Sequence, residues 1–206
     1  MAHAALLKPV TARGETTRRR LLDAAEQEFG DKGFHDTSIT SITLRAGAAQ
    51  GTFYLYFRSK QEIFLTLVRD IGHRLRAEAS AAIDQAADRM AAERLGLEAF
   101  LQFAAKHRGL YRIVQESRFI DATVYREYYE KLAEGYAEGL AQAARRGELA
   151  PGDAEVRAWA LMGIGHFLGL RWCEWNRKLP SPAVLDAVMD FVSRGMAPRA
   201  PRKLTR

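Results

Sequence analysis

Apolar side chains recur every three or four residues along most of the chain, a spacing that predicts helices. Leu21, Ala25 and Phe29 form the first stripe, and Gly33 is expected to end the helix that carries it. No segment stands out with the alternation of apolar and polar residues that is typical of strands. Further helices are expected at residues 38–46, 49–57, 60–83, 91–107, 109–117, 122–147, 153–177 and 181–195. The pattern therefore predicts an all-α fold.

The second expected helix, at residues 38–46, is rich in Ile and Thr, which would also suit a strand. Ile39 and Ile42 lie three apart, and Gly47 supplies a stop, so we favour a helix. Three short helices with a tight glycine turn between the second and third make a helix-turn-helix arrangement. We expect a flexible arm at residues 1–14, the helix-turn-helix domain at 15–60, a helical domain at 61–195 and a disordered basic tail at 196–206.

The charge of +6 is unevenly distributed along the 206 residues. Residues 1–76 carry +4, residues 77–193 carry −3 and residues 194–206 carry +5. Positive ends around an acidic middle fit an N-terminal part that meets a polyanion, and they fit equally well a solvated surface with a basic tail. No long apolar run predicts a membrane span or a secretory signal, and a single cysteine, Cys173, suits a reducing compartment, so a cytoplasmic protein is expected.

The third short helix has the residue types of a DNA-reading element. Phe53 and Phe57 lie four apart and should pack inward, which leaves polar residues for the outer side. Gln50 suits bidentate pairing with adenine in the major groove, which admits one helix. Ser59 and Glu62 form a capping box around Lys60, where a cation opposes the helix dipole. A phosphate bound by Lys60 would relieve that conflict.

These residues resemble the TetR/AcrR family of bacterial regulators over residues 15–70. The match comprises Arg19, Ala24, Ala25, Phe29, Gly33, Phe34, Thr37, Ile42, Ala46, Gly47, Gly51 to Phe57, Ser59, Lys60, Ile63 and Phe64. Ala48, Ala49 and Thr43 depart from the residues common in the family, and Ala49 removes an expected helix cap and phosphate contact. The resemblance implies an N-terminal helix-turn-helix and a C-terminal helical bundle for ligand binding and dimerisation.

The resemblance also implies a homodimeric repressor that binds a double-stranded DNA operator and is released by a small molecule. The DNA contacts that it implies come from Thr37, Ser38, Thr40, Gln50, Gly51, Thr52, Tyr54, Tyr56 and Lys60. Arg18, Arg19 and Arg20 form either a phosphate patch or a solvated helix start, and Arg45 is equally open. Repressor is preferred to activator by analogy with the family alone.

The C-terminal half supplies candidates for an effector site and a dimer interface. Ala158 to Cys173 is apolar on nearly every side, so that helix should be buried on several sides. An apolar or aromatic effector is expected, because ligand pockets are mostly apolar with a few polar groups. Its candidate residues are Phe103, Tyr111, Arg118, Phe119, Tyr125, Tyr128, Trp159, Met162 and His166. The candidate interface comprises Gly165, Leu168, Gly169, Trp172, Leu185, Val188, Met189 and Val192, for which burial within one subunit is the alternative.

Two other classes of function remain as alternatives. An enzyme is disfavoured because no phosphate loop, catalytic triad signature or His-Glu-x-x-His motif occurs. None of the five histidines has metal-ligand spacing to another, so no catalytic residue, metal or cofactor is expected. The second alternative is a helical protein–protein interaction module without specific DNA binding, in which the basic ends would be incidental.

Overall fold

The computed structural model describes residues 12–198, and within that range it contains helices and no strand, as the all-α prediction requires. The elements are α1 (Ala12–Asp36), α2 (Ile39–Ala46), α3 (Gln50–Tyr56), α4 (Lys60–Ile83), α5 (Arg89–Lys106), α6 (Leu110–Ile120), α7 (Ala122–Arg145), α8 (Ala154–Gly169), the π-helical turn η1 (Leu170–Trp175) and α9 (Pro182–Met196). Most of the predicted arm and tail lies outside the described residues, but residues 12–14 of the arm already belong to α1.

The chain forms two compact units that do not follow a single cut along the sequence. The first unit holds the described residues up to His73 together with His107–Tyr128. The second unit holds Arg74–Lys106 and the described residues from Tyr129 onward. Packing therefore draws α6 and the start of α7 into the N-terminal unit, which the boundary predicted at residue 60 does not anticipate.

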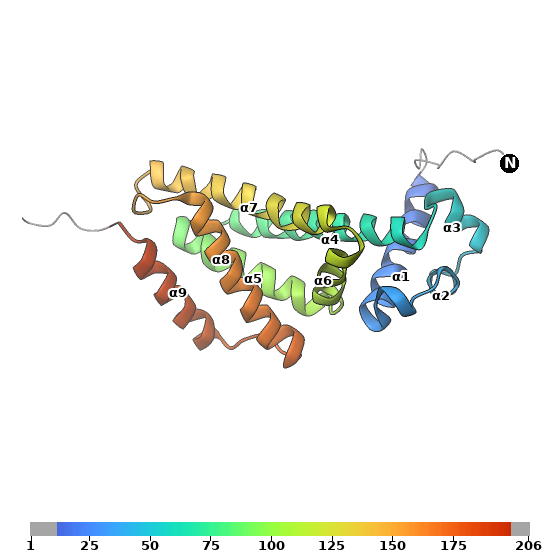
Figure 1. Ribbon diagram of the computed structural model, residues 1–206. Helices are drawn as coiled ribbons and strands as arrows, with labels where there is room; N and C mark the ends of the chain where they lie inside the picture. Colours follow the sequence, from blue (N-terminus) through green and yellow to red (C-terminus); the bar gives the residue numbers. More distant parts are fainter. Residues whose placement is uncertain (1–11, 199–206) are drawn as a thin grey trace, which may run out of the picture. The chain divides into compact units, whose positions relative to one another are not determined.

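The core of the first unit forms where the stripe of α1 meets the stripe of α4. Leu21, Ala25 and Phe29 are fully buried, as their spacing predicts. The rings of Phe29 and Phe64 meet edge to face with their centroids 4.9 Å apart. Figure 1 shows α2 and α3 beside α1, completing the helix-turn-helix.

Helix α6 packs on α1 through a close backbone contact between two glycines. A Cβ at Gly30 would lie 2.8 Å from the Cα of Gly109, and a Cβ at Gly109 would lie 2.5 Å from the Cα of Gly30. His107 Nδ1 lies 2.5 Å from Glu26 Oε1 beside this contact. On the other side, a guanidinium nitrogen of Arg112 donates to the carbonyl of Asp31 at 2.7 Å. The absence of side chains at the two glycines lets these helices approach.

Local signals place the predicted helix ends correctly. Gly33 has φ 82° and breaks the helical path of α1, and Gly47 has φ 59° at the end of α2. Both angles lie in the left-handed region that glycine adopts without strain. At the start of α4, Ser59 Oγ accepts from the Glu62 amide at 3.1 Å, as expected. Glu62 Oε2 accepts from the Arg58 amide at 2.7 Å, one residue earlier than a standard capping box requires.

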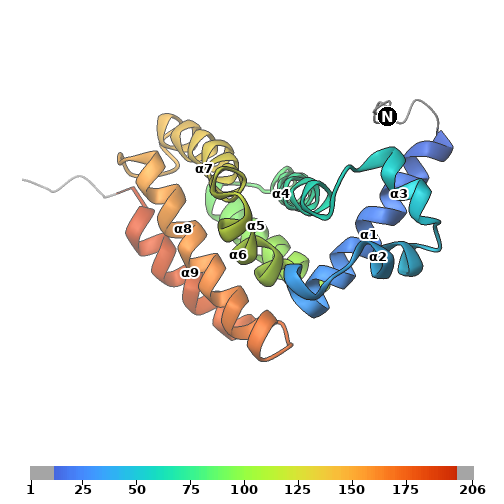
Figure 2. The same cartoon turned by 45° about the vertical axis from the view of Figure 1, so that its right-hand side comes forward.

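In the second unit, α8 and α9 run antiparallel and side by side (Figures 1 and 2). The Ala150 amide, just before α8, donates to the carbonyl of Met196 at the end of α9 at 2.9 Å. Their shared core comprises Leu140, Ala143, Leu149, Ala158, Val192 and Met196. No helix in the described part of the chain combines the length and the apolar character needed to cross a membrane.

A buried polar network links α5 and α7 within this unit. The Arg89 guanidinium pairs with Glu93 at 2.6 Å, and the Tyr136 hydroxyl donates to the same carboxylate. Burial raises the pKa of Tyr136 well above its ordinary value, and the Glu93 charge adds to this effect. Each polar group of the network has a partner, which is the condition for burying charge in a core.

Candidate nucleic-acid interface

Helix α2 is fixed at both of its ends, and the second of these forms the turn to α3. Ser38 Oγ accepts from the Ser41 amide at 3.0 Å and begins α2. At the other end, the amides of Gly47 and Ala48 donate back to carbonyls of the last turn. The Arg20 guanidinium of α1 donates to the Ala46 carbonyl at 2.5 Å. Ala49 begins α3 without a side-chain cap, as its departure from the family pattern predicts.

Helix α3 has a buried face and an exposed face, as predicted. Phe53 and Phe57 are buried, and the Arg18 guanidinium lies 5.7 Å from the centre of the Phe57 ring. Gln50 and Gly51 are exposed, and the Tyr54 side chain is 51% exposed. The anchored phenylalanines hold the helix while its other side remains open, which is the arrangement that a major-groove reader requires.

Two predicted contact residues on different helices are brought together. Gln50 Nε2 donates to Thr40 Oγ1 at 2.6 Å, although both residues are exposed. This hydrogen bond orients the Gln50 amide before any ligand arrives, and it leaves the side-chain oxygen as an acceptor. Ser38 is exposed on the same short helix as Thr40, so these three side chains form the polar centre of the candidate surface.

Thr37 does not belong to the exposed surface, contrary to the expectation from the family resemblance. Its side chain is buried, and its Oγ1 atom lies 3.0 Å from the Glu28 carbonyl and 2.7 Å from the Gly33 carbonyl. A hydroxyl has one proton to donate, and these α1 carbonyls share it. Thr37 therefore fastens the start of α2 to α1, and its hydroxyl is not available to DNA.

Lys60 is also engaged inside the protein. Its ammonium group donates to the carbonyls of Phe34, His35 and Thr37 at 2.7, 3.1 and 2.8 Å. It also lies 4.6 Å from the centre of the Phe34 ring. A lysine ammonium has three donors, and all three have protein acceptors here. The expected phosphate contact of Lys60 is therefore corrected to an intramolecular one.

The arginines left open by the sequence are occupied within the unit. Arg19 pairs with Asp70 at 2.9 Å, and Arg45 pairs with Glu28 at 2.6 Å. Each of these cations therefore has a structural partner. Arg58, directly after α3, is exposed and was missed by the sequence analysis, because a single surface arginine gives no periodic signal. It is the additional candidate for a phosphate contact.

Glu28 is a buried acid that the sequence analysis did not single out. Its carboxylate receives Lys32 Nζ and Arg45 Nε, each at 2.6 Å, and so connects α1 to α2. Burial alone would raise the pKa of this group. Hydrogen bonds from Lys32, Ser41 and Arg45 outweigh burial and lower the pKa to about 2. The ionised form of Glu28 therefore stabilises the helix-turn-helix.

We expect acid to remove this stabilisation. Because folding lowers the pKa of Glu28 from 4.5, its contribution is complete above that pH and is lost as the pH falls towards 2. Chemical unfolding at a series of pH values should show a shallower acid-side loss of stability for Glu28→Gln than for the wild type. Glu78→Gln, at an exposed position on α4, is the control and should match the wild type. Parallel curves for Glu28→Gln and wild type would contradict the assignment.

The predicted effector residues divide between the two units, so their convergence on one cavity stays a prediction. Tyr111 and Tyr128 are buried in the first unit, and Phe103 is buried in the second. Phe119 is 86% exposed, because it lies opposite the buried stripe of α6, and this exposure contradicts a place in an enclosed site. The remaining candidates are partly or fully exposed: Arg118, Tyr125, Trp159, Met162 and His166.

His166 of α8 lies against Tyr129 of α7, with ring centroids 6.5 Å apart. Burial lowers the pKa of His166 below its ordinary value, so the imidazole is neutral near pH 7. A neutral imidazole both donates and accepts a hydrogen bond, and it suits an uncharged polar group on an otherwise apolar ligand.

Three of the predicted interface residues face their own subunit. Gly165 packs against Leu97 and Phe100 of α5, and a Cβ there would already be in contact with both. Gly169 is buried, and Val192 belongs to the core that α8 and α9 share. The reason is that α8 is apolar all round, so composition does not indicate which face it turns inward.

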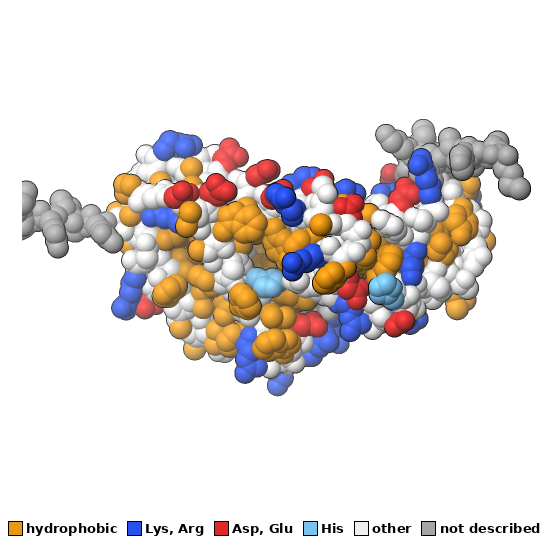
Figure 3. All heavy atoms as spheres, in the orientation of Figure 1, with side chains coloured by type: hydrophobic (Ala, Val, Ile, Leu, Met, Phe, Trp, Pro, Cys, Tyr) orange, Lys and Arg blue, Asp and Glu red, His pale blue; other side chains and the backbone are white. Residues whose placement is uncertain are grey.

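The outward face of α8 and α9 is nevertheless apolar. Phe167 is 68% exposed on α8, and Phe191 is 70% exposed on α9. Figure 3 shows apolar side chains gathered at the surface over α8. Between the helices runs an open groove of about 450 Å³. Its lining comprises Ile164, Leu168, Trp172, Ala183, Val184, Ala187, Val188 and Phe191.

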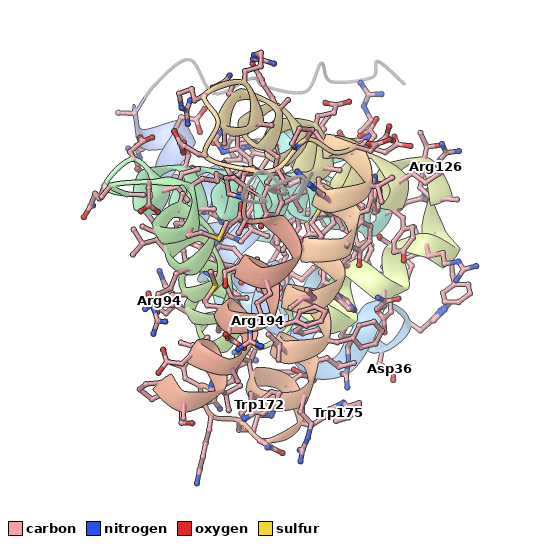
Figure 4. The ribbon with its side chains drawn as sticks, turned by 90° about the vertical axis from the view of Figure 1, so that its left-hand side faces the viewer. Asp36, Arg94, Arg126, Trp172, Trp175 and Arg194 are labelled. Atoms are coloured by element: carbon pink, nitrogen blue, oxygen red, sulfur yellow. The ribbon has the colours of Figure 1, made fainter. Side chains whose placement is uncertain are left out.

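Two tryptophans of η1 mark one end of this face. In Figure 4, Trp172 lies near the start of α9, while Trp175 lies farther from that helix. Trp172 lines the groove, and Trp175 is largely exposed. Of the predicted interface residues, Leu168, Trp172 and Val188 line the groove. Leu185 and Met189 are partly buried, and Met189 packs against the core that α8 and α9 share.

Comparison with known proteins agrees with this architecture. Residues 21–67 match the family model described as bacterial regulatory proteins of the tetR family. The HTH-type transcriptional regulator YdgC of Bacillus subtilis strain 168 is 46% identical over 65 residues. That alignment covers 32% of this chain and only 33% of YdgC. The sequence match is therefore concentrated in the helix-turn-helix.

Solved structures extend the likeness to the C-terminal helices. A TetR family transcription regulator from Marinobacter aquaeolei VT8 gives a TM-score of 0.73 at 18% identity, over 91% of this chain and 98% of its own. The fatty acid degradation regulator FadR from Bacillus halodurans gives a TM-score of 0.68 at 20% identity, over 85% and 94%. These likenesses establish a shared fold beyond the segment that matches in sequence. The chain therefore shares the fold of these regulators, and its residues 21–67 match the tetR family of bacterial regulatory proteins.

Proposed function

We propose that this protein is a ligand-responsive repressor that binds operator DNA as a homodimer in the bacterial cytoplasm. The main support for this function is the exposed face of α3. Phe53 and Phe57 anchor the helix on its other side, and the hydrogen bond from Gln50 to Thr40 lies at the exposed face. Members of the family are transcriptional regulators rather than enzymes, they bind DNA and small effectors, and they are typically dimers. An interaction module without DNA binding would have no need of a pre-oriented glutamine on an open helix.

The outward face of α8 and α9 supports a second copy of the chain as the partner. Large exposed aromatic residues and an apolar groove on one face are features of an interaction site. A two-fold axis places the same face of each subunit against the other, so Phe167 and Phe191 would be covered in both. A pair of subunits also presents α3 twice, and two-fold symmetric operators match this arrangement.

The proposed effector is apolar or aromatic. FadR of Bacillus halodurans is a regulator of fatty acid degradation, so fatty acids belong in the first panel of test compounds beside aromatic compounds. A ligand that binds the native state should increase the free energy of unfolding by about 2.7 kcal/mol at a hundredfold excess over Kd. The melting temperature should rise accordingly. The same compound should release the protein from DNA. A stabilising compound without any effect on DNA binding would contradict its role as effector.

Binding to the DNA that flanks its own gene tests the function directly. Fluorescence anisotropy should show a preference of at least about a thousandfold for that duplex over a shuffled one. Affinity should fall steeply with rising salt, because phosphate contacts release counterions. Equal, weak binding to every duplex would favour the interaction-module alternative.

Gln50 should contribute to base recognition. We expect Gln50→Ala to relax discrimination at one base position in each half-site, by about 1–3 kcal/mol, when all single substitutions of the operator are compared. Thr40→Val is the matched variant, because it removes the partner of the Gln50 amide but leaves the amide in place. It should weaken the same preference by a smaller amount. An unchanged preference in Gln50→Ala would exclude this residue from the contact.

A further inference from the structure

We infer that Lys60 is a positioning residue whose ammonium group fixes the start of α2, and that it is not a phosphate ligand. Its three acceptors are consecutive or nearly consecutive carbonyls, at Phe34, His35 and Thr37, which converge on one nitrogen. The positive φ of Gly33 breaks the helical path of α1 directly before these residues. The DNA-binding part of this inference rests on the proposed function, whereas the structural part does not.

The three carbonyls around the Lys60 ammonium group also relieve the electrostatic conflict at the start of α4. Lys60 is the first residue of that helix, where the positive end of the dipole disfavours a cation. Three carbonyl oxygens and the face of the Phe34 ring supply the opposing negative charge. No external anion is needed to stabilise the ammonium group at this position.

Thr37 connects the carbonyls around Lys60 to the candidate DNA surface. Its hydroxyl is held by carbonyls of α1, and its own carbonyl accepts from Lys60. The next residue, Ser38, is the N-cap of α2, and the exposed Thr40 follows within the first turn. Lys60 therefore sets where α2 begins, and through Thr40 it sets the partner of Gln50.

The wild-type protein gives the first test without any substitution or DNA. In ¹⁵N NMR, the ammonium protons of Lys60 should exchange with water far more slowly than those of Lys131, which is exposed on α7. Slow exchange follows from three hydrogen bonds to carbonyls. Equally fast exchange at both lysines would overturn the inference.

Substitution gives the second test. We expect Lys60→Met to lower the melting temperature by about 3–8 °C and to speed amide exchange at Ser38 to Ser41. At a temperature where this variant is folded, operator affinity should fall about tenfold or more, while the slope of log affinity against log salt stays unchanged. Lys60→Arg should not restore the affinity, because a planar guanidinium does not reproduce three converging donors.

A phosphate ligand would behave differently in every measurement. Lys60→Met would then keep the wild-type melting temperature and reduce the salt slope by about one, and Lys60→Arg would restore binding. Arg58→Met, at an exposed neighbouring cation, is the control that should leave the melting temperature unchanged. Absence of specific DNA binding by the wild type would count against the proposed function alone, because the exchange and melting results are obtained without DNA.

Discussion

The double variant Phe167→Glu, Phe191→Glu should be monomeric and should lose operator affinity by about two to four orders of magnitude. Both side chains are more than two-thirds exposed on the face that we propose as the interface. A pair of charges on each subunit would meet their copies across a two-fold axis, in a region that association would desolvate. Loss of the dimer removes the effective concentration that links binding at the two half-sites.

Analytical ultracentrifugation and DNA binding should report the two effects together. Phe119→Glu is the matched control, because it changes an even more exposed phenylalanine that lies on α6 in the other unit. The control should keep the wild-type mass and affinity. A double variant that still sediments as a dimer would show that another face holds the subunits together.

Gly109→Val should destabilise the first unit by about 1–3 kcal/mol, or more if the helices cannot separate. A Cβ at this position would lie 2.5 Å from the Cα of Gly30, so backbone rather than a flexible side chain would have to move. Separation of α1 from α6 would also strain the His107–Glu26 and Arg112–Asp31 contacts. Because the helix-turn-helix rests on α1, DNA affinity should fall as well.

Gly135→Ala tests whether the effect depends on the site. A Cβ at Gly135, in the middle of α7, would meet nothing within 4 Å. Alanine should therefore be neutral or stabilising there, by up to about 1 kcal/mol, because it favours the helix over the unfolded chain. Differential scanning calorimetry compares the two variants. A Gly109→Val protein that melts like the wild type would mean that the glycine contact contributes little.

The helices were predictable from the sequence because their signals are local. Apolar residues at helical spacing, glycines with positive φ and serine caps act within one turn, and Gly33, Gly47 and Ser38 behave as expected. The inward turn of Phe53 and Phe57 follows from the same periodicity. The resemblance of residues 21–67 to the tetR family was equally accessible, because the matching motif lies in one ungapped stretch.

The roles of individual polar residues were less predictable, because they depend on partners distant in sequence. Lys60 and Thr37 have the residue types of phosphate contacts, but carbonyls at the end of α1 occupy both. Glu28 gave no signal, since its partner Arg45 lies on another helix. On α8, periodicity was absent altogether, so the inward face could be identified only from packing against α5.

Methylation protection of a selected operator tests the central claim most directly, because dimethyl sulfate probes guanine N7 in the major groove. The account predicts two protected segments related by two-fold symmetry, and loss of protection in both when Gln50 and Tyr54 are replaced by alanine. Protection confined to one segment, or a pattern that the two substitutions leave intact, would contradict a symmetric pair of α3 helices in the major groove.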